Sequence, residues 1–289
     1  MRMHCEAHRH GPGPTLSPNC AQPGLKQFIH RTWHRIRRHW RGPCAEHYSE
    51  IDLLQRRLTA GENAGRVMVD VGAQFGESFT PFRQQGWRIL AFEPDPDPRK
   101  QEALKALACA EVMIVRRALA EHSREAADFY ASYVSTGIST LVPFHESHRA
   151  VGKVEVSTLA LELAKEKLNR VDFIKVDTEG HDLFVLKGFP WGRPELRPRA
   201  VLCEYEDAKT RPLGYTWQDM ADFLVAQGYA VLVSEWKPIV RYGVRHDWLG
   251  LQRYPGARVN PDGWGNLIAL STPEDVAWVV GEAFKCSRA

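Results

Sequence analysis

Residues 66–78 read RVMVDVGAQFGES, and this stretch decides the fold class. Its first half is a nearly continuous apolar run, which is typical of a parallel strand covered by helices on both faces. Gly72 and Gly76 follow directly, and glycine lets a backbone approach a ligand closely. From here strand and helix patterns alternate to the end of the chain. The alternation predicts a doubly wound α/β sheet with helices on both faces.

The expected elements follow from hydrophobic periodicity and from glycine and proline signals. Strands are expected at 66–73, 87–94, 110–120, 171–177, 199–206, 229–236 and 265–271, with an added strand at 126–133. Helices are expected at 46–58, 77–85, 97–108, 157–168, 181–187, 216–228 and 273–284.

The bulk composition restricts the class of protein. The 289 residues suit one α/β domain with extensions, and the net charge of +3 gives no reason to expect a nucleic-acid partner. Six scattered cysteines without a CxxC pair favour reduced thiols over a zinc site or a disulfide framework. We find neither an apolar signal segment nor a run near the ~18 apolar residues of a membrane span. These features predict a cytoplasmic protein.

The N-terminal region differs from the rest. Residues 1–24 are rich in His, Pro and Gly and are predicted to be a disordered tail, and residues 25–63 a helical extension before a catalytic domain at 64–289. Within the extension, 26–41 reads KQFIHRTWHRIRRHWR, a basic amphipathic helix. Two interpretations stay open. The helix either contacts an anionic membrane surface at the inner face, or packs on its own catalytic domain or a second subunit.

The ends of the first two strands predict a nucleoside cofactor. Gln74 and Glu77 stand where the dinucleotide fingerprint needs glycines, and Asp70 would repel a diphosphate. Glu93, at the end of the second strand, suits the two hydroxyls of a ribose. S-adenosylmethionine is a common cofactor of this kind, and its cationic sulfonium is favoured by a nearby carboxylate.

The sequence resembles the FkbM-type methyltransferases between Val67 and Tyr229. The motifs that carry the resemblance are DVGAQFGES (70–78), FEPDP (92–96), RALAEH (117–122), GISTL (137–141), VSTLALE (156–162), VDFIKVDTEGHDLFVLKGF (171–189) and VLCEYE (201–206). The resemblance implies a Rossmann-like class I methyltransferase fold, a seven-stranded, mostly parallel sheet whose last strand is antiparallel. It implies that S-adenosylmethionine is bound by Asp70, Gly72, Ala73, Gly76, Glu93, Pro94, Ala118 and Asp177.

The segment DTEGHD at 177–182 crowds ionisable side chains into one turn where the family usually has D-V-E-G-A-E. The predicted catalytic residues are His181, Asp177 and Glu179. In one scheme His181 is a general base oriented by Asp177 or Glu179, and the clustered charges raise either one carboxyl pKa or the pKa of His181. In the other, Asp177 and Glu204 hold Mg²⁺, which lowers the pKa of the substrate hydroxyl.

The predicted function is O-methylation of a hydroxyl on a sugar, a glycan or a glycosylated small molecule. The alternative is a catalytically silent S-adenosylmethionine-binding or regulatory module of the same fold. A nicotinamide oxidoreductase is disfavoured by the missing glycines, and a hydrolase by the lack of a G-x-S-x-G motif.

Overall fold

The computed structural model describes residues 48–242, 244 and 246–286. The predicted tail at 1–24 and the predicted basic helix at 26–41 lie outside these residues. The described α-helices are α2 (Glu50–Leu58), α3 (Thr80–Arg83), α4 (Pro98–Leu107), α5 (Leu159–Lys165), α6 (Asp182–Lys187), α7 (Asp207–Thr210), α8 (Trp217–Ala226) and α9 (Pro273–Cys286). Short 3₁₀ helices are η3 (Thr136–Ile138), η4 (Pro194–Leu196) and η5 (Arg211–Leu213).

The central sheet has eight strands in the order β10-β9-β11-β8-β7-β1-β2-β3. Their bounds are β1 (Val67–Val71), β2 (Arg88–Phe92), β3 (Val112–Val115), β7 (Phe173–Val176), β8 (Ala200–Glu206), β9 (Ala230–Trp236), β10 (Trp248–Tyr254) and β11 (Trp264–Leu270). β3, β2, β1, β7 and β8 pair in parallel, while β11 is antiparallel to β8 and β9. The doubly wound fold and the antiparallel last strand are confirmed. The predicted count of seven is wrong by one, because β10 adds an antiparallel edge strand beside β9.

The strand order reverses at β1. The chain moves outward from β1 to β2 and β3, and then β7 returns to pair with the other side of β1. Ligands of doubly wound sheets bind beyond the carboxyl ends of the strands at such a switch point. The site is therefore expected where β1 and β7 end.

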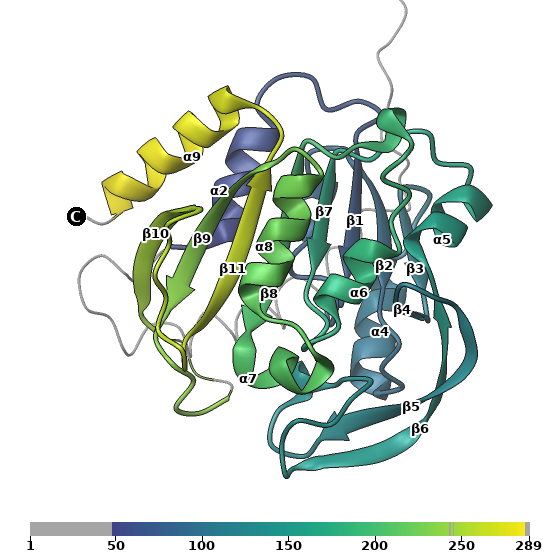
Figure 1. The fold of residues 1–289 in the computed structure, drawn as a ribbon. Coiled ribbons are helices and arrows are strands. Elements are labelled where there is room, and N and C mark those ends of the chain that lie inside the picture. Colours follow the sequence, from purple (N-terminus) through teal and green to yellow (C-terminus); the bar gives the residue numbers. More distant parts are fainter. Residues whose placement is uncertain (1–47, 243, 245, 287–289) are drawn as a thin grey trace, which may run out of the picture. The chain divides into compact units, whose positions relative to one another are not determined.

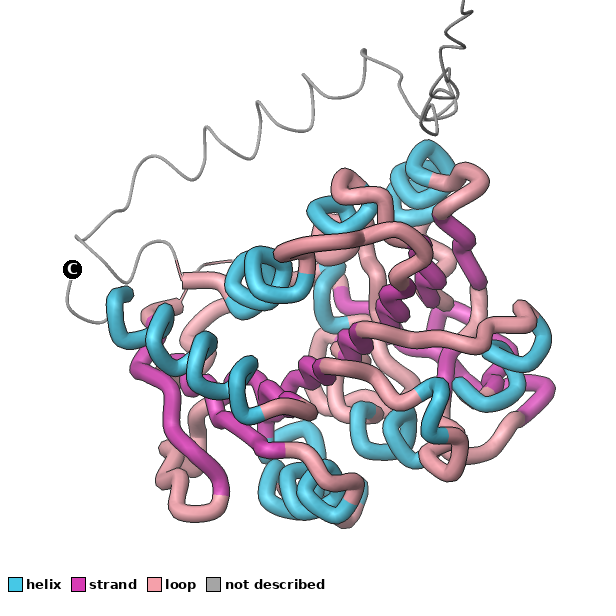
Figure 2. Tube along the Cα trace, turned by 90° about the horizontal axis from the view of Figure 1, so that it is seen from above, coloured by secondary structure: helices cyan, strands magenta, loops and turns pink. Residues whose placement is uncertain are grey.

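Helices cover both faces of the sheet (Figures 1 and 2). Alternate residues of β1 enter different cores: Val67, Val69 and Val71 pack with residues of α5, α6 and α8, while Met68 packs with residues of α2, α3, α4 and α9. All five residues of β1 are buried, which explains why the run is apolar except for Asp70.

A separate three-stranded sheet lies between β3 and α5 in sequence. It consists of β4 (Ala118–Leu119), β5 (Arg124–Ser132) and β6 (His148–Ser157) in the order β4-β6-β5. The strand predicted at 110–120 is thus two strands in two sheets. β6 was not predicted, because most of its residues are exposed and lack an apolar pattern. Figure 1 shows β5 and β6 beyond the ends of the central strands that carry the site.

α2 belongs to the core of the catalytic domain. Leu53, Leu54 and Leu58 are buried in the hydrophobic cluster that also contains residues of α9. Asp275 of α9 accepts hydrogen bonds from Arg57 of α2 and from Arg199. The predicted domain boundary at residues 63 and 64 therefore falls inside one packed unit. No helix among the described residues is long and apolar enough to cross a membrane.

Candidate active site

The turn after β1 is held against the end of β7. Gly72 has φ +80°, and a Cβ there would lie 1.9 Å from the carbonyl oxygen of Asp177. Only glycine tolerates both the left-handed backbone and the close approach. Gly76 instead faces Leu107 and Phe79, which a Cβ would meet at 2.5 and 2.7 Å, so its role is packing.

Lys175 of β7 joins the two predicted aspartates. Its Nζ lies 3.5 Å from Asp70 Oδ1 and 3.2 Å from Asp177 Oδ2, and it donates to the carbonyl oxygen of Gly72 at 3.0 Å. Burial by itself lowers the pKa of Lys175, but Asp177 and Asp70 raise it above its usual value. Burial raises the pKa of Asp70, against the effects of Lys175 and of Ser78, which donates to Asp70. Asp70 is fully buried behind the turn, so it supports the site through Lys175.

Glu93 is fixed by two backbone groups at the end of β2. Its Oε2 accepts from the N–H of Gln74 at 2.7 Å, and its Oε1 accepts from the N–H of Asp95 at 2.9 Å. Each carboxylate oxygen can accept a second hydrogen bond, so two acceptor positions remain for the hydroxyls of a ribose. Burial raises the pKa of Glu93, opposed chiefly by the positive charge of Lys100.

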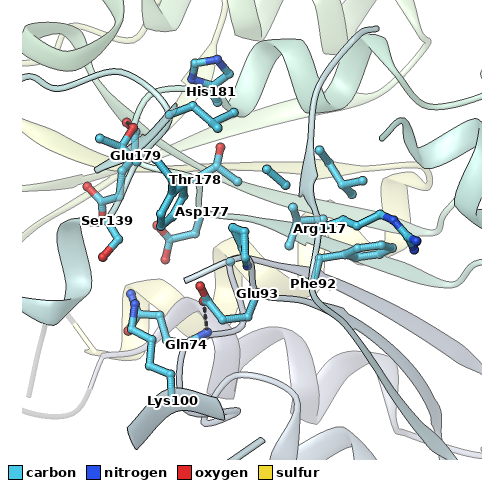
Figure 3. Close-up of a pocket in the computed structure, with 18 of the residues that line it drawn as sticks. Gln74, Phe92, Glu93, Lys100, Arg117, Ser139, Asp177, Thr178, Glu179 and His181 are labelled. Carbon is cyan, nitrogen blue, oxygen red and sulfur yellow. Dashed lines mark hydrogen bonds between the residues drawn. The ribbon is translucent and has the colours of Figure 1, made fainter. Parts of the chain in front are cut away.

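One pocket at the switch point brings most of the predicted residues together. Its walls include Gly72, Glu93, Pro94, Ala118, Asp177, Glu179 and His181. Asp70, Ala73, Gly76 and Glu204 are not among the residues that line it. In Figure 3, Asp177 and Thr178 lie between Glu93 and His181.

The turn after β7, residues 177–182, is held in shape by one of its own acidic side chains, Asp182. Asp182 accepts from the N–H groups of Thr178 and Gly180 at 3.3 and 3.2 Å, and Tyr215 donates to the carbonyl oxygen of Gly180 at 2.7 Å. Burial and the charge of Asp177 raise the pKa of Asp182 to about 6. One of the crowded acids therefore has a structural role, which is to fix the turn that presents the others.

His181 caps α6 at its N-terminus and is 7% exposed. Burial, together with the charge of Arg124, lowers the pKa of His181 to about 4. Of the two expected effects, the raised pKa of His181 is wrong, because burial and Arg124 both lower it, whereas a raised carboxyl pKa is found at Glu179, at about 7. Nδ1 of His181 has no hydrogen-bond partner among the described residues, so orientation by Asp177 or Glu179 is not seen.

The predicted metal ligands lie close to a buried lysine. One oxygen each from Asp177, Glu179 and Glu204 lies within 4.8 Å of the others. Such carboxylate oxygens suit Mg²⁺. However, Nζ of Lys209 lies 2.6 Å from Glu179 and 3.3 Å from Glu204. A cation in this cluster would have to share two of its three ligands with an ammonium.

Several residues of the site were missed by the sequence-based prediction. Gln74 and Arg117 line the pocket, as do Ser139 and Thr140, which lie just after η3. Lys175 could have been noticed, since a lysine inside the apolar run VDFIKVD needs a buried counter-charge. Lys209, in the loop-like stretch EDAKT, carries no such signal.

The strand order, the switch point and the pocket together define the class of protein. The sheet, the left-handed glycine after β1 and the fixed carboxylate after β2 are those of an S-adenosylmethionine-dependent methyltransferase of class I. A family model described as the methyltransferase FkbM domain matches residues 70–231, more than half of the chain. The chain therefore belongs to the FkbM methyltransferase family.

Two solved structures show the extent of similarity to known proteins. The precorrin-6y C5,15-methyltransferase of Geobacter metallireducens GS-15 is 13% identical, with 75% of this chain and 85% of that chain covered and a TM-score of 0.39. The magnesium protoporphyrin IX methyltransferase of Synechocystis PCC 6803, with bound SAM, is 12% identical, with 85% and 92% covered and a TM-score of 0.37. These scores are too low to carry an argument. No curated protein matches the sequence.

Proposed function

We propose that this methyltransferase transfers the methyl group of S-adenosylmethionine to a hydroxyl of a sugar, a glycan or a glycosylated small molecule. The observation that carries the proposal is a set of buried polar atoms on the turn after β7. Asp177 Oδ1, Thr178 Oγ1 and His181 Nδ1 have no hydrogen-bond partner within the described part of the chain. Buried polar atoms are normally hydrogen-bonded, so three on one pocket wall suit a ligand with several hydroxyls.

The residues present fit S-adenosylmethionine. Glu93 offers two acceptor positions for the ribose hydroxyls, and Asp177 contributes negative charge to the same pocket. The bound cofactor supplies a methyl group already activated by its positively charged sulfur. What the chain must add is an oriented hydroxyl and an acceptor for its proton.

His181 is the proposed general base. Asp177 is ion-paired with Lys175, and Glu179 is ion-paired with Lys209. Burial nevertheless raises the pKa of Glu179 to about 7, so Glu179 is the competing base, although its carboxylate is held by the Lys209 ammonium while His181 Nδ1 has no partner among the described residues. With its pKa lowered to about 4, His181 is neutral at physiological pH, and Nδ1 of its Nε2-protonated tautomer can take the hydroxyl proton.

Two further polar residues of the pocket, Ser139 and Thr140, are held by hydrogen bonds within the protein. Ser139 donates to Asp95 at 2.6 Å, and Thr140 donates to the carbonyl oxygen of Glu179 at 3.1 Å. These bonds connect the segment after η3 to both ends of the pocket. Mg²⁺ bound by Asp177 and Glu204 is the competing scheme, and it would replace His181 as the means of lowering the hydroxyl pKa.

The test is a transfer assay with radiolabelled S-adenosylmethionine against sugar nucleotides, glycans and glycosylated natural products. Labelled product should be a methyl ether, which resists mild alkali, and Glu93→Gln should lower labelling at limiting cofactor by roughly 10- to 100-fold. An alkali-labile ester, or labelling of amines alone, would contradict the proposal. Cofactor binding by calorimetry without transfer to any of these acceptors would favour the silent binding module.

A further inference from the structure

Lys209 is a buried lysine surrounded by three glutamates at the acceptor end of the site. Lys209 is 4% exposed, and its Nζ lies 2.6 Å from Glu179, 2.7 Å from Glu206 and 3.3 Å from Glu204. The ring centroid of Phe144 lies 5.3 Å away. Three carboxylates at ion-pair distances are the partners of an ammonium, so the side chain is the cation of this cluster.

The position of this cation follows from its element. α7 begins directly after β8, so Lys209 can reach back to Glu204 and Glu206. These two residues are two positions apart and therefore lie on the same side of β8. Glu179 comes from the neighbouring strand end, after β7. One ammonium thus connects two adjacent strand ends.

The surrounding carboxylates favour such a cation. Oxygens of Asp177, Glu179 and Glu204 converge within 4.8 Å, and burial together with their mutual repulsion raises the pKa of Glu179 to about 7 and that of Glu204 well above its usual value. Lys175 neutralises Asp177 from one side, and Lys209 contacts the other two members. Each of the three carboxylates is therefore paired with a buried ammonium.

We propose that Lys209 is a positioning residue that takes the place of a divalent metal ion, holding Glu179 and Glu204 at the acceptor end, so that methyl transfer needs no divalent metal. The link to acceptor methylation rests on the proposed function above. The replacement of a metal ion by Lys209 does not rest on it, since metal binding can be measured without any acceptor.

The direct test is a Mn²⁺ titration of the full-length protein followed by electron paramagnetic resonance. Lys209→Met removes the charge and keeps most of the side-chain length, and it should bind Mn²⁺ roughly tenfold to a hundredfold more tightly than the wild type. Adding Glu204→Gln to this variant should remove the gain. Lys153→Met is the matched control, because it breaks the exposed pair with Asp128 and should leave Mn²⁺ affinity at the wild-type level.

Activity gives an independent readout. Exhaustive chelation should leave wild-type transfer unchanged, while Lys209→Met should lower turnover at saturating acceptor and Lys209→Arg should restore part of it. Mn²⁺ binding to the wild type as tight as to Lys209→Met, or loss of wild-type transfer on chelation with recovery in Mg²⁺, would overturn the proposal. If Lys209→Met does not fold, the wild-type titration and chelation decide alone. If no acceptor is methylated, the titration still tests Lys209 while the proposed function fails.

Discussion

Replacing Glu93 by Gln is the sharpest test of the cofactor site. The carboxylate is 3% exposed and accepts one backbone N–H on each oxygen, leaving one acceptor position on each for a ribose hydroxyl. The substitution keeps the shape but turns one oxygen into an NH₂ donor, so the charged acceptor for one ribose hydroxyl is lost together with the bond from one backbone N–H. A hydrogen bond to a charged group contributes about 1.5–3 kcal/mol, which predicts a roughly 10- to 100-fold rise in the Kd for S-adenosylmethionine.

Calorimetric titration measures this change. The exposed Glu102→Gln on α4 is the control and should bind as the wild type does. S-adenosylhomocysteine analogues without ribose hydroxyls should bind the wild type and Glu93→Gln equally, which separates a ribose contact from a general disturbance of the pocket. A folded Glu93→Gln variant with unchanged affinity for S-adenosylmethionine would refute the assignment.

Four further changes have defined outcomes. His181→Asn should lower the rate of single-turnover transfer ~10²–10⁴-fold with cofactor affinity unchanged. Because the pKa of His181 is lowered to about 4, its contribution to the rate should be constant from pH 6 to 8 and fall only on acidification. An effect of about twofold would mean that His181 is not the base. Gly72→Ala should lower the Tm more than Gly86→Ala, since both have positive φ but only Gly72 has an atom within 4 Å of the added Cβ; equal shifts would contradict the packing argument. Asp275→Asn should cost about 2–4 kcal/mol at pH 7. Burial alone would raise the pKa of Asp275, but its two arginines lower it, so its stabilisation is present above the unfolded pKa of about 3.9, and the difference in chemical denaturation should shrink as pH falls below that value. Deleting residues 1–44 should leave cofactor affinity unchanged and alter sedimentation or liposome binding; if neither changes, the basic segment 26–41 serves neither self-association nor membrane contact.

Much of the fold could be predicted because its signals are local. The apolar run at 67–71 and the glycine after it identify a covered parallel strand, and the alternation that follows allows few topologies. The elements that were missed are those without a local signal. β6 is largely exposed, and β10 is an edge strand interrupted by Gly250, which has φ +145°.

The order of residues along the chain already places Glu93 and Asp177 at strand ends. Parallel strands bring their carboxyl ends to one edge, so Glu93 and Asp177 had to approach the same crevice, and both line the pocket. Gly72 was predicted on the same ground.

Only the tertiary structure decided the charge state and partners of these groups. Lys175 comes between Asp70 and Asp177, and Lys209 reaches the glutamates from a separate short helix. The pKa rises at Glu179 and falls at His181, where the sequence left open which of the two kinds of group would be raised. The physical reason is that pairing and desolvation depend on distances across strands and on exclusion of water, which the order of residues along a chain does not contain.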